Sequence, residues 1–102
     1  MEVQQLPALT HKELQRHVEE LFKLFHWKFY HTYRSTRSVP GYPDYHALRG
    51  KRQLVAELKV GRDKPSIAQL EWLYAFAELD NCEVYVWRPE DWTGGDIEKL
   101  LI

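Results

Sequence analysis

The sequence predicts a small mixed α/β domain whose elements follow the order αβββαβ, with a short helix after the last strand. Two capping boxes mark helix starts, an aromatic-rich alternating segment marks a strand, and a turn between apolar runs marks a hairpin. The chain has 102 residues, about the commonest size of a single domain. It contains no internal repeat and no Gly/Ser-rich linker, so residues 1–102 are predicted to form one domain.

Both long helices are predicted from their N-terminal signals. Thr10-x-x-Glu13 is a capping box, and the apolar stripe expected after it is Leu14, Val18, Leu21 and Phe25. Ser66-x-x-Gln69 is a second capping box, and it opens a helix that runs to about residue 79. The side chains expected to face inward from this second helix are Leu70, Leu73, Ala77 and Phe76.

Four segments are predicted as strands, and they are residues 27–33, 44–48, 53–60 and 83–87. Residues 34–43 form a loop, because two prolines and a glycine punctuate polar residues. The segment 49–51 turns the second strand into the third, so these two strands form a hairpin. Pro89 and the residues after it form a turn and a short terminal helix.

Composition excludes several classes of protein. The chain is 44% hydrophobic and 28% charged, the balance of a soluble globular domain. No apolar run approaches the roughly 18 residues of a membrane span, and no signal peptide opens the chain, so an intracellular, cytoplasmic location and no membrane partner are expected. The single cysteine, Cys82, excludes an intrachain disulfide and a Cys-based zinc site.

The formal net charge of −1 is a sum over unequal blocks. Residues 27–64 carry nine basic groups against three acidic ones, whereas residues 65–102 carry two basic groups against eight acidic ones. Local fields steer polyanions more than the total charge does. The basic residues of the middle block are therefore predicted to surround a site for nucleic acid, and the acidic final third is predicted to carry a homodimer surface instead.

The pattern that carries chemistry is Pro43-Asp44, twelve intervening residues, and Glu57-Leu58-Lys59. Strand side chains alternate between faces, so Glu57 and Lys59 project together while Leu58 points into the core. If Asp44 begins the partner strand, its carboxylate lies beside Glu57. Two close carboxylates favour a cation with oxygen ligands, such as Mg²⁺ or Mn²⁺. An ordinary surface Glu–Lys pair is the alternative for the E-x-K part alone.

Four blocks in this order resemble the virus-type replication-repair nuclease (VRR-NUC) domain of the PD-(D/E)XK nuclease superfamily, in particular its stand-alone phage and bacterial members. The blocks are Gly41-Tyr42-Pro43-Asp44, residues 54–59 (LVAELK), residues 69–73 (QLEWL) and residues 85–89 (YVWRP). The resemblance implies a restriction-endonuclease-like αβββαβ core with a mixed central sheet. It also implies Mg²⁺- or Mn²⁺-dependent cleavage of DNA by a homodimer, with branched substrates such as four-way (Holliday) junctions.

The resemblance assigns roles to individual residues. Asp44, Glu57 and the backbone carbonyl of Leu58 become metal ligands, and Lys59 becomes the catalytic lysine. A glutamine at the position of Gln69 lies near the lysine and the metal-bound water in the family, although Gln69 can also simply cap its helix. In the loop before Asp44, the expected DNA phosphate contacts are Arg34 and Arg37.

The acidic residue that many relatives carry on the first helix has no clear counterpart. His11 follows the N-cap where relatives often carry a glutamate, and Gln15 occupies the other common position. Wheel arithmetic at about 100° per residue places Glu20 on one flank of the apolar stripe, with Glu13, and points Glu19 to solvent. The order of preference for a supporting role is Gln15, Glu20 and then Glu13.

Two other functions stay open at this level. A nuclease-like fold that only binds nucleic acid or a protein would fit the unclear helix acid. A nuclease acting on RNA or tRNA would share the same motif. A nucleotide cofactor is not expected, because the chain has no Gly-rich phosphate loop.

Overall fold

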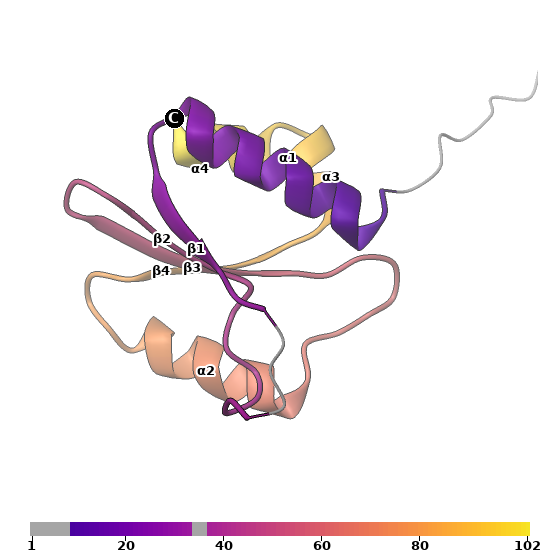
Figure 1. Cartoon of the computed structure of the whole chain (residues 1–102), viewed down its shortest axis with the longest axis vertical. Helices are drawn as coiled ribbons and strands as arrows, with labels where there is room; N and C mark the ends of the chain where they lie inside the picture. Colours follow the sequence, from indigo (N-terminus) through magenta and orange to yellow (C-terminus); the bar gives the residue numbers. More distant parts are fainter. Residues whose placement is uncertain (1–8, 34–36) are drawn as a thin grey trace, which may run out of the picture.

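The computed structural model describes residues 9–33 and 37–102. Its elements are α1 (His11–Leu24), β1 (Lys28–His31), β2 (Tyr45–Arg49), β3 (Arg52–Leu58), α2 (Ile67–Ala77), β4 (Glu83–Trp87), α3 (Pro89–Thr93) and α4 (Asp96–Leu101). Figure 1 shows three layers, with α1, α3 and α4 on one face of the sheet and α2 on the other. Among the described residues, no helix has the length and apolar character to cross a membrane.

The sheet has the order β1-β2-β3-β4 and mixes two kinds of pairing. β1 pairs antiparallel with β2, and β2 pairs antiparallel with β3 as a hairpin. β3 and β4 are parallel, because α2 carries the chain back across the sheet between them. The predicted αβββαβ order, the hairpin and the mixed central sheet are confirmed.

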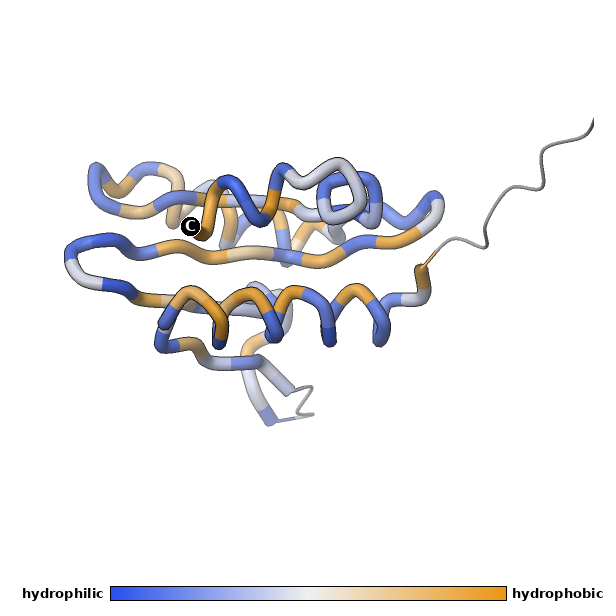
Figure 2. Tube along the Cα trace, turned by 90° about the horizontal axis from the view of Figure 1, so that it is seen from above, coloured by the Kyte–Doolittle hydropathy of each residue, from blue (hydrophilic) through white to orange (hydrophobic). Residues whose placement is uncertain are grey.

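α1 begins as predicted, because the Thr10 and Glu13 side chains each bond the other residue's backbone N–H. Figure 2 shows hydrophobic and hydrophilic residues alternating along this helix, which starts beside the grey trace. Its buried residues are Leu14, Val18 and Phe22. Leu21 and Phe25 are partly buried and pack against the same core as predicted, although the helix ends at Leu24 and Phe25 is its C-cap.

The core lies between the sheet and the layer of α1, α3 and α4. β2 contributes Tyr45 and Ala47, β3 contributes alternate residues, and α4 contributes Ile97 and Leu101. The first strand begins later than predicted, because the backbone N–H of Trp27 donates to the Phe22 carbonyl of α1 at 2.8 Å. Trp27 is buried, and its indole N–H donates to the Leu101 carbonyl at 2.9 Å. This bond joins the start of β1 to the end of α4.

α2 covers the opposite face of the sheet incompletely. Leu73 is its buried residue, Leu70 and Phe76 are half-buried, and Ala77 is exposed, so the inward prediction for Ala77 is wrong. Phe76 takes the inward direction, since its ring lies 5.7 Å from that of His46 on β2. The turn of the helix that contacts the sheet therefore runs through Leu73 and Phe76.

Candidate active site

A cleft of about 1100 Å³ opens where the β2–β3 hairpin meets the loop 37–43 and the first turns of α2. Asp44 lies at the start of β2, and Glu57 and Lys59 lie at the end of β3, so the open end of the hairpin brings all three to the cleft. The other described residues that line it are His11, Tyr30, Thr32, Tyr33, Ser38, Val39, Pro40, Gly41, Tyr42, Val60, Asp63, Ser66, Ala68, Gln69 and Trp72.

Asp44 is held by backbone bonds on both sides. The Leu58 N–H donates to Asp44 Oδ2 at 2.8 Å, which ties the carboxylate to the end of β3. The Thr32 N–H donates to the Asp44 carbonyl at 2.8 Å, and the Thr32 hydroxyl donates to the Pro43 carbonyl at 2.7 Å. These bonds orient the Asp44 carboxylate across the end of the hairpin, toward β3.

Glu57 is buried, with 1% of its surface exposed, although it is an acidic side chain. Burial raises the pKa of Glu57 well above its ordinary value, the neighbouring Asp44 carboxyl raises it further, and the Lys59 charge acts in the opposite direction. Among the described residues, Glu57 Oε2 has no hydrogen-bond partner. An ionised Glu57 in this position would be unfavourable without a cation beside it.

Leu58 and Lys59 complete the end of β3 as the alternation predicts. The Leu58 side chain is in the core, and its backbone N–H faces the Asp44 edge of the strand. A residue's N–H and C=O point to the same edge of a strand, so the Leu58 carbonyl faces that edge as well. The Lys59 N–H donates to the Trp87 carbonyl on β4 at 3.0 Å, while its side chain lines the cleft.

The donors at this site suit a hard divalent cation. The two carboxylates and the backbone carbonyl all offer oxygen ligands. Among the described residues, no hydrogen-bond donor occupies Glu57 Oε2, so this oxygen can accept a bond to a cation. Across residues 9–33 and 37–102, no group of three or more His, Cys, Asp and Glu side chains is arranged so that it could hold a metal ion by itself. Mg²⁺ keeps several waters and takes one or two carboxylates from a protein, so this donor set fits Mg²⁺ or Mn²⁺.

His11 is the α1 residue that the structure brings to the cleft. Its Nε2 lies 3.7 Å from Asp44 Oδ2, and its side chain is partly exposed. No role was predicted for His11 from the sequence, and its position directly after the N-cap was the available signal. The first turn of α1 approaches the open end of the hairpin, so a side chain there reaches Asp44.

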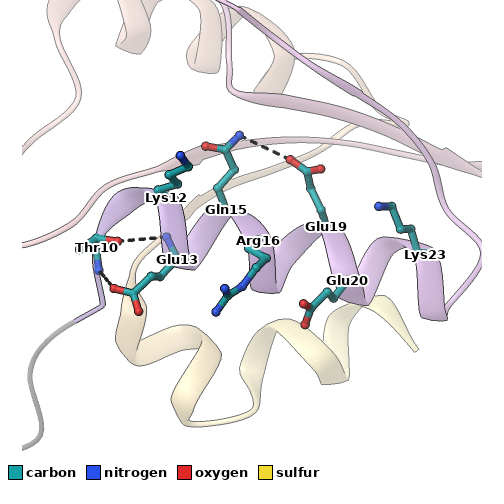
Figure 3. Close-up of a pocket in the computed structure, with 8 residues that line it drawn as sticks. All are labelled: Thr10, Lys12, Glu13, Gln15, Arg16, Glu19, Glu20 and Lys23. Carbon is teal, nitrogen blue, oxygen red and sulfur yellow. Dashed lines mark hydrogen bonds between the residues drawn. The ribbon is translucent and has the colours of Figure 1, made fainter.

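The other α1 candidates lie outside the lining of this cleft (Figure 3). Gln15 Nε2 lies 3.1 Å from a ring nitrogen of His31 and 3.5 Å from Glu19 Oε2, and Glu20 contacts His17 at 3.8 Å on the side toward α3 and α4. Glu13 serves its capping box. The expectation that Glu19 points to solvent is wrong, because the buried Tyr45 draws it inward and donates its hydroxyl proton to Glu19 Oε2 at 2.5 Å.

The Gln69 side chain both caps α2 and lines the cleft, which are the two positions predicted for it. Its side-chain oxygen accepts the Ser66 N–H at 2.8 Å, which completes the capping box, and its side chain also lines the cleft. Arg37 is exposed in the loop 37–43 that forms one wall. Arg34 lies outside the described residues.

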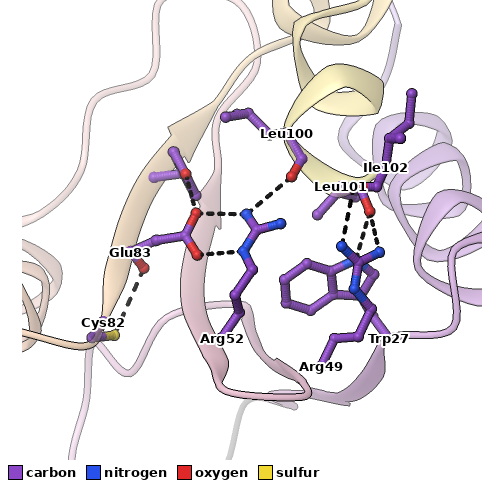
Figure 4. A network of polar contacts seen from close by, with 9 residues as sticks. Trp27, Arg49, Arg52, Cys82, Glu83, Leu100, Leu101 and Ile102 are labelled. Atoms are coloured by element: carbon purple, nitrogen blue, oxygen red, sulfur yellow. Dashed lines mark hydrogen bonds and ion pairs between the residues drawn. The ribbon is translucent and has the colours of Figure 1, made fainter.

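The prediction that the basic block surrounds the site is wrong for the hairpin turn. Arg49 and Arg52 lie at the closed end of the hairpin, roughly 17 Å of strand from Asp44. Figure 4 shows both guanidinium groups beside Trp27 and the end of α4. Arg49 donates to the carbonyls of Leu101 and Ile102, and Arg52 forms a two-point ion pair with Glu83. These residues fasten the C-terminal helix to the sheet.

Comparison with known proteins yields a structural likeness. No protein-family model and no curated protein matches the chain. A solved VRR_NUC domain superposes on it with a TM-score of 0.64 at 22% sequence identity, covering 88% of this chain and 91% of that domain. The likeness agrees with the resemblance found in the sequence motifs and confirms the predicted αβββαβ core with its mixed central sheet. The chain therefore has the fold of a VRR_NUC domain.

Proposed function

We propose that this protein is a Mg²⁺- or Mn²⁺-dependent DNA endonuclease. The observation that carries the proposal is the buried Glu57 carboxyl group, which lies against Asp44, has an unpartnered oxygen and opens on a cleft that Lys59 also lines. A buried acidic group with a strongly perturbed pKa, lying in a cleft beside a charged partner, is typical of catalytic sites. The likeness of the fold to a VRR_NUC domain supports a nuclease function for this cleft.

Each residue has a defined task in this proposal. Asp44, Glu57 and the Leu58 carbonyl hold the cation, which when bound polarises the phosphoryl oxygen and lowers the pKa of a water. Lys59 places a positive charge beside the reacting phosphate, where negative charge develops during hydrolysis. Gln69 orients water at the mouth of the cleft, and Arg37, with Arg34, contacts neighbouring phosphates.

The substrate that we propose is branched DNA, such as a four-way junction, and the active species is a homodimer. The sequence motifs that resemble VRR-NUC domains support both points, and the fold agrees with that resemblance. Two copies of the cleft in one particle would let the enzyme cut two strands of the same junction.

The test is cleavage of a panel of DNA structures, which contains a four-way junction, a flap, a duplex and a single strand, with and without Mg²⁺ or Mn²⁺. The wild type is expected to cut a branched member only when the metal is present. Glu57→Ala and Lys59→Ala should each lower the rate by roughly 100-fold or more. Both variants should still bind the DNA.

Glu71→Gln is the matched control, because Glu71 is exposed on α2 and lies outside the cleft lining. It should cleave like the wild type. Undiminished cutting by Glu57→Ala or Lys59→Ala would reject the proposal. Metal-independent DNA binding without any cleavage would favour the non-catalytic alternative, and cleavage confined to a parallel RNA panel would reassign the substrate.

A further inference from the structure

Two exposed tyrosines line the same cleft as the acidic pair. Tyr30 on β1 is 64% exposed and Tyr33, directly after β1, is 77% exposed. Neither ring belongs to the core, so neither has a large part in holding the fold together. Large exposed aromatic side chains beside a candidate site are typical of contact surfaces.

The tyrosines are held by neighbours of their own. Tyr30 pairs with His46 across β1 and β2, on the face of the sheet where the His46 ring packs against Phe76. The Tyr33 ring lies 4.7 Å from that of His31, and the His31 ring in turn stacks on Tyr45 at 5.0 Å. The His31 ring therefore supports the Tyr33 ring from one side, and the β1–β2 pairing fixes the backbone position of Tyr30.

Two further aromatic side chains line the cleft. The rings of Tyr42 and Trp72 meet edge to face at 5.1 Å, and the Trp72 indole N–H donates to the Pro40 carbonyl at 3.2 Å. This contact ties the loop 37–43 to α2. The acidic pair of Asp44 and Glu57 therefore shares its cleft with four aromatic side chains, which are Tyr30, Tyr33, Tyr42 and Trp72.

The described residues that line the cleft itself offer few positive charges to a DNA backbone, and the arginines proposed to contact neighbouring phosphates belong to the loop before Asp44. Among the described residues that line the cleft, Lys59 is the one lysine or arginine, and it faces the carboxyl groups of Asp44, Glu57 and Asp63. Non-specific duplex binding rests on many lysine and arginine contacts to phosphate. Stacking of bases on aromatic rings is the other main source of affinity for nucleic acid, and it is open only to unpaired bases, whose faces are uncovered.

We propose that the cleft binds an unpaired nucleotide of the DNA, with its base stacked on Tyr30 or Tyr33, beside the phosphate to be cut. This inference rests on the proposed nuclease function and narrows its substrate. The preferred branched DNA is then one that offers an unpaired stretch at the branch, and a fully paired duplex is a poor ligand for the cleft.

The test measures binding in EDTA, so that cleavage plays no part. Fluorescence anisotropy gives the Kd of the whole protein for a labelled 12-nucleotide thymidine strand, for an abasic strand of equal length and charge, and for a duplex. The wild type should bind the thymidine strand about five-fold or more tightly than the abasic strand. Tyr30→Ala and Tyr33→Ala should bring these two affinities together, and Tyr30→Phe and Tyr33→Phe, which keep the ring, should preserve the difference.

Leu24→Ala is the control for truncation of an exposed apolar side chain, since Leu24 is 62% exposed at the far end of α1. It should leave all affinities unchanged. Equal binding of the thymidine and abasic strands by the wild type would overturn the inference, as would an equal loss in Leu24→Ala. Base-dependent binding without metal-dependent cleavage would count against the nuclease proposal alone, and cleavage without base-dependent binding would count against the stacking surface alone.

Discussion

Glu57 lowers the stability of the folded protein when its carboxyl group is ionised and no cation is bound beside it. Its carboxyl group is buried beside that of Asp44, so ionisation takes a charge into surroundings of low polarity and next to a like charge. The metal-free protein keeps this group protonated instead. The residue on which the proposed chemistry depends is therefore also one that limits stability.

We predict that Glu57→Gln stabilises the metal-free protein at pH 8. The folded pKa of Glu57 is raised above its ordinary value of 4.5, so the stability it contributes is present below that pH and is lost as the pH rises. The glutamine variant does not ionise and should unfold with a free energy roughly 1–3 kcal/mol higher than the wild type at pH 8. Urea denaturation in EDTA at pH 5 and pH 8 measures this difference.

The difference between the two proteins should grow from pH 5 to pH 8, and added Mg²⁺ should raise the Tm of the wild type more than that of the variant. Glu71→Gln, at an exposed position, is the control and should show neither effect. A constant difference across the pH range would contradict the prediction.

At the scale of single residues, the sequence could predict what the hairpin brings together. Asp44, Glu57 and Lys59 are joined by strand alternation and one turn, which are local properties. The approach of His11 to Asp44 depends on the position in which α1 packs on the sheet, and no local sequence pattern predicts that position. Glu19 faces inward because the buried Tyr45 hydroxyl needs an acceptor, a tertiary demand that a helical wheel does not contain.

At the scale of elements, one wall of the cleft depends on the contact between the loop 37–43 and α2. Gly41 has a φ of +92°, and a Cβ atom placed there would lie 2.5 Å from the Ala68 carbonyl carbon and 2.8 Å from the Gln69 nitrogen. Both atoms are backbone atoms in the first turn of α2, so they cannot move aside as a side chain would. The glycine is what lets the loop lie against the helix.

We predict that Gly41→Ala destabilises the protein by about 2 kcal/mol or more, because it adds a backbone clash to the strain of a positive φ. Gly50→Ala is a matched control in the hairpin turn, where φ is +59° and no atom lies within 4 Å of the added Cβ. The control should lose only about 1 kcal/mol. Urea denaturation of both variants measures the two losses, and equal losses would contradict the role given to Gly41.

Helix starts were predictable because capping boxes are local, and both predicted boxes form. The ends of helices and strands were less predictable from the sequence. β1 ends early at His31, since Thr32 turns its hydroxyl to the Pro43 carbonyl, and the inward face of α2 shifts to Phe76 because His46 and Tyr42 lie opposite. These limits arise from partners that are distant in the sequence.

At the scale of the whole molecule, α2 leaves an apolar face outward. Nine of its 11 residues are apolar, yet Ile67 is 78% exposed and Tyr74 is 68% exposed. A helix that is hydrophobic all round is normally buried. The acidic final third carries this face, and it is the surface through which we expect two copies to associate.

We predict that the wild type has a mass of about twice 12.2 kDa by light scattering at micromolar concentration. Replacing Ile67 and Tyr74 together by aspartate should yield the mass of one chain, because the charges would have to be buried in the interface. Circular dichroism provides the check on folding. A monomeric wild type at this concentration would contradict the prediction.

The block structure of charge was a partial guide at this scale. It separated an acidic third from a basic middle, but it could not show that Arg49 and Arg52 serve the end of α4 while Lys59 serves the cleft. Net charge by segment ignores which end of a hairpin a residue occupies. The register of β2 and β3 decides that, with Arg49 opposite Arg52 at the turn and Tyr45 opposite Ala56 near the site.

The bond between Trp27 and Leu101 has a consequence for how the chain acquires its structure during synthesis. The core under α1 includes Ile97 and Leu101, and β3 lacks its parallel neighbour until residues 83–87 have been made. When only the first two-thirds of the chain has emerged from the ribosome, one edge of β3 and the apolar stripe of α1 are therefore exposed. Contacts between residues so far apart slow folding, and unpaired strand edges favour aggregation, so this domain closes late and as a unit.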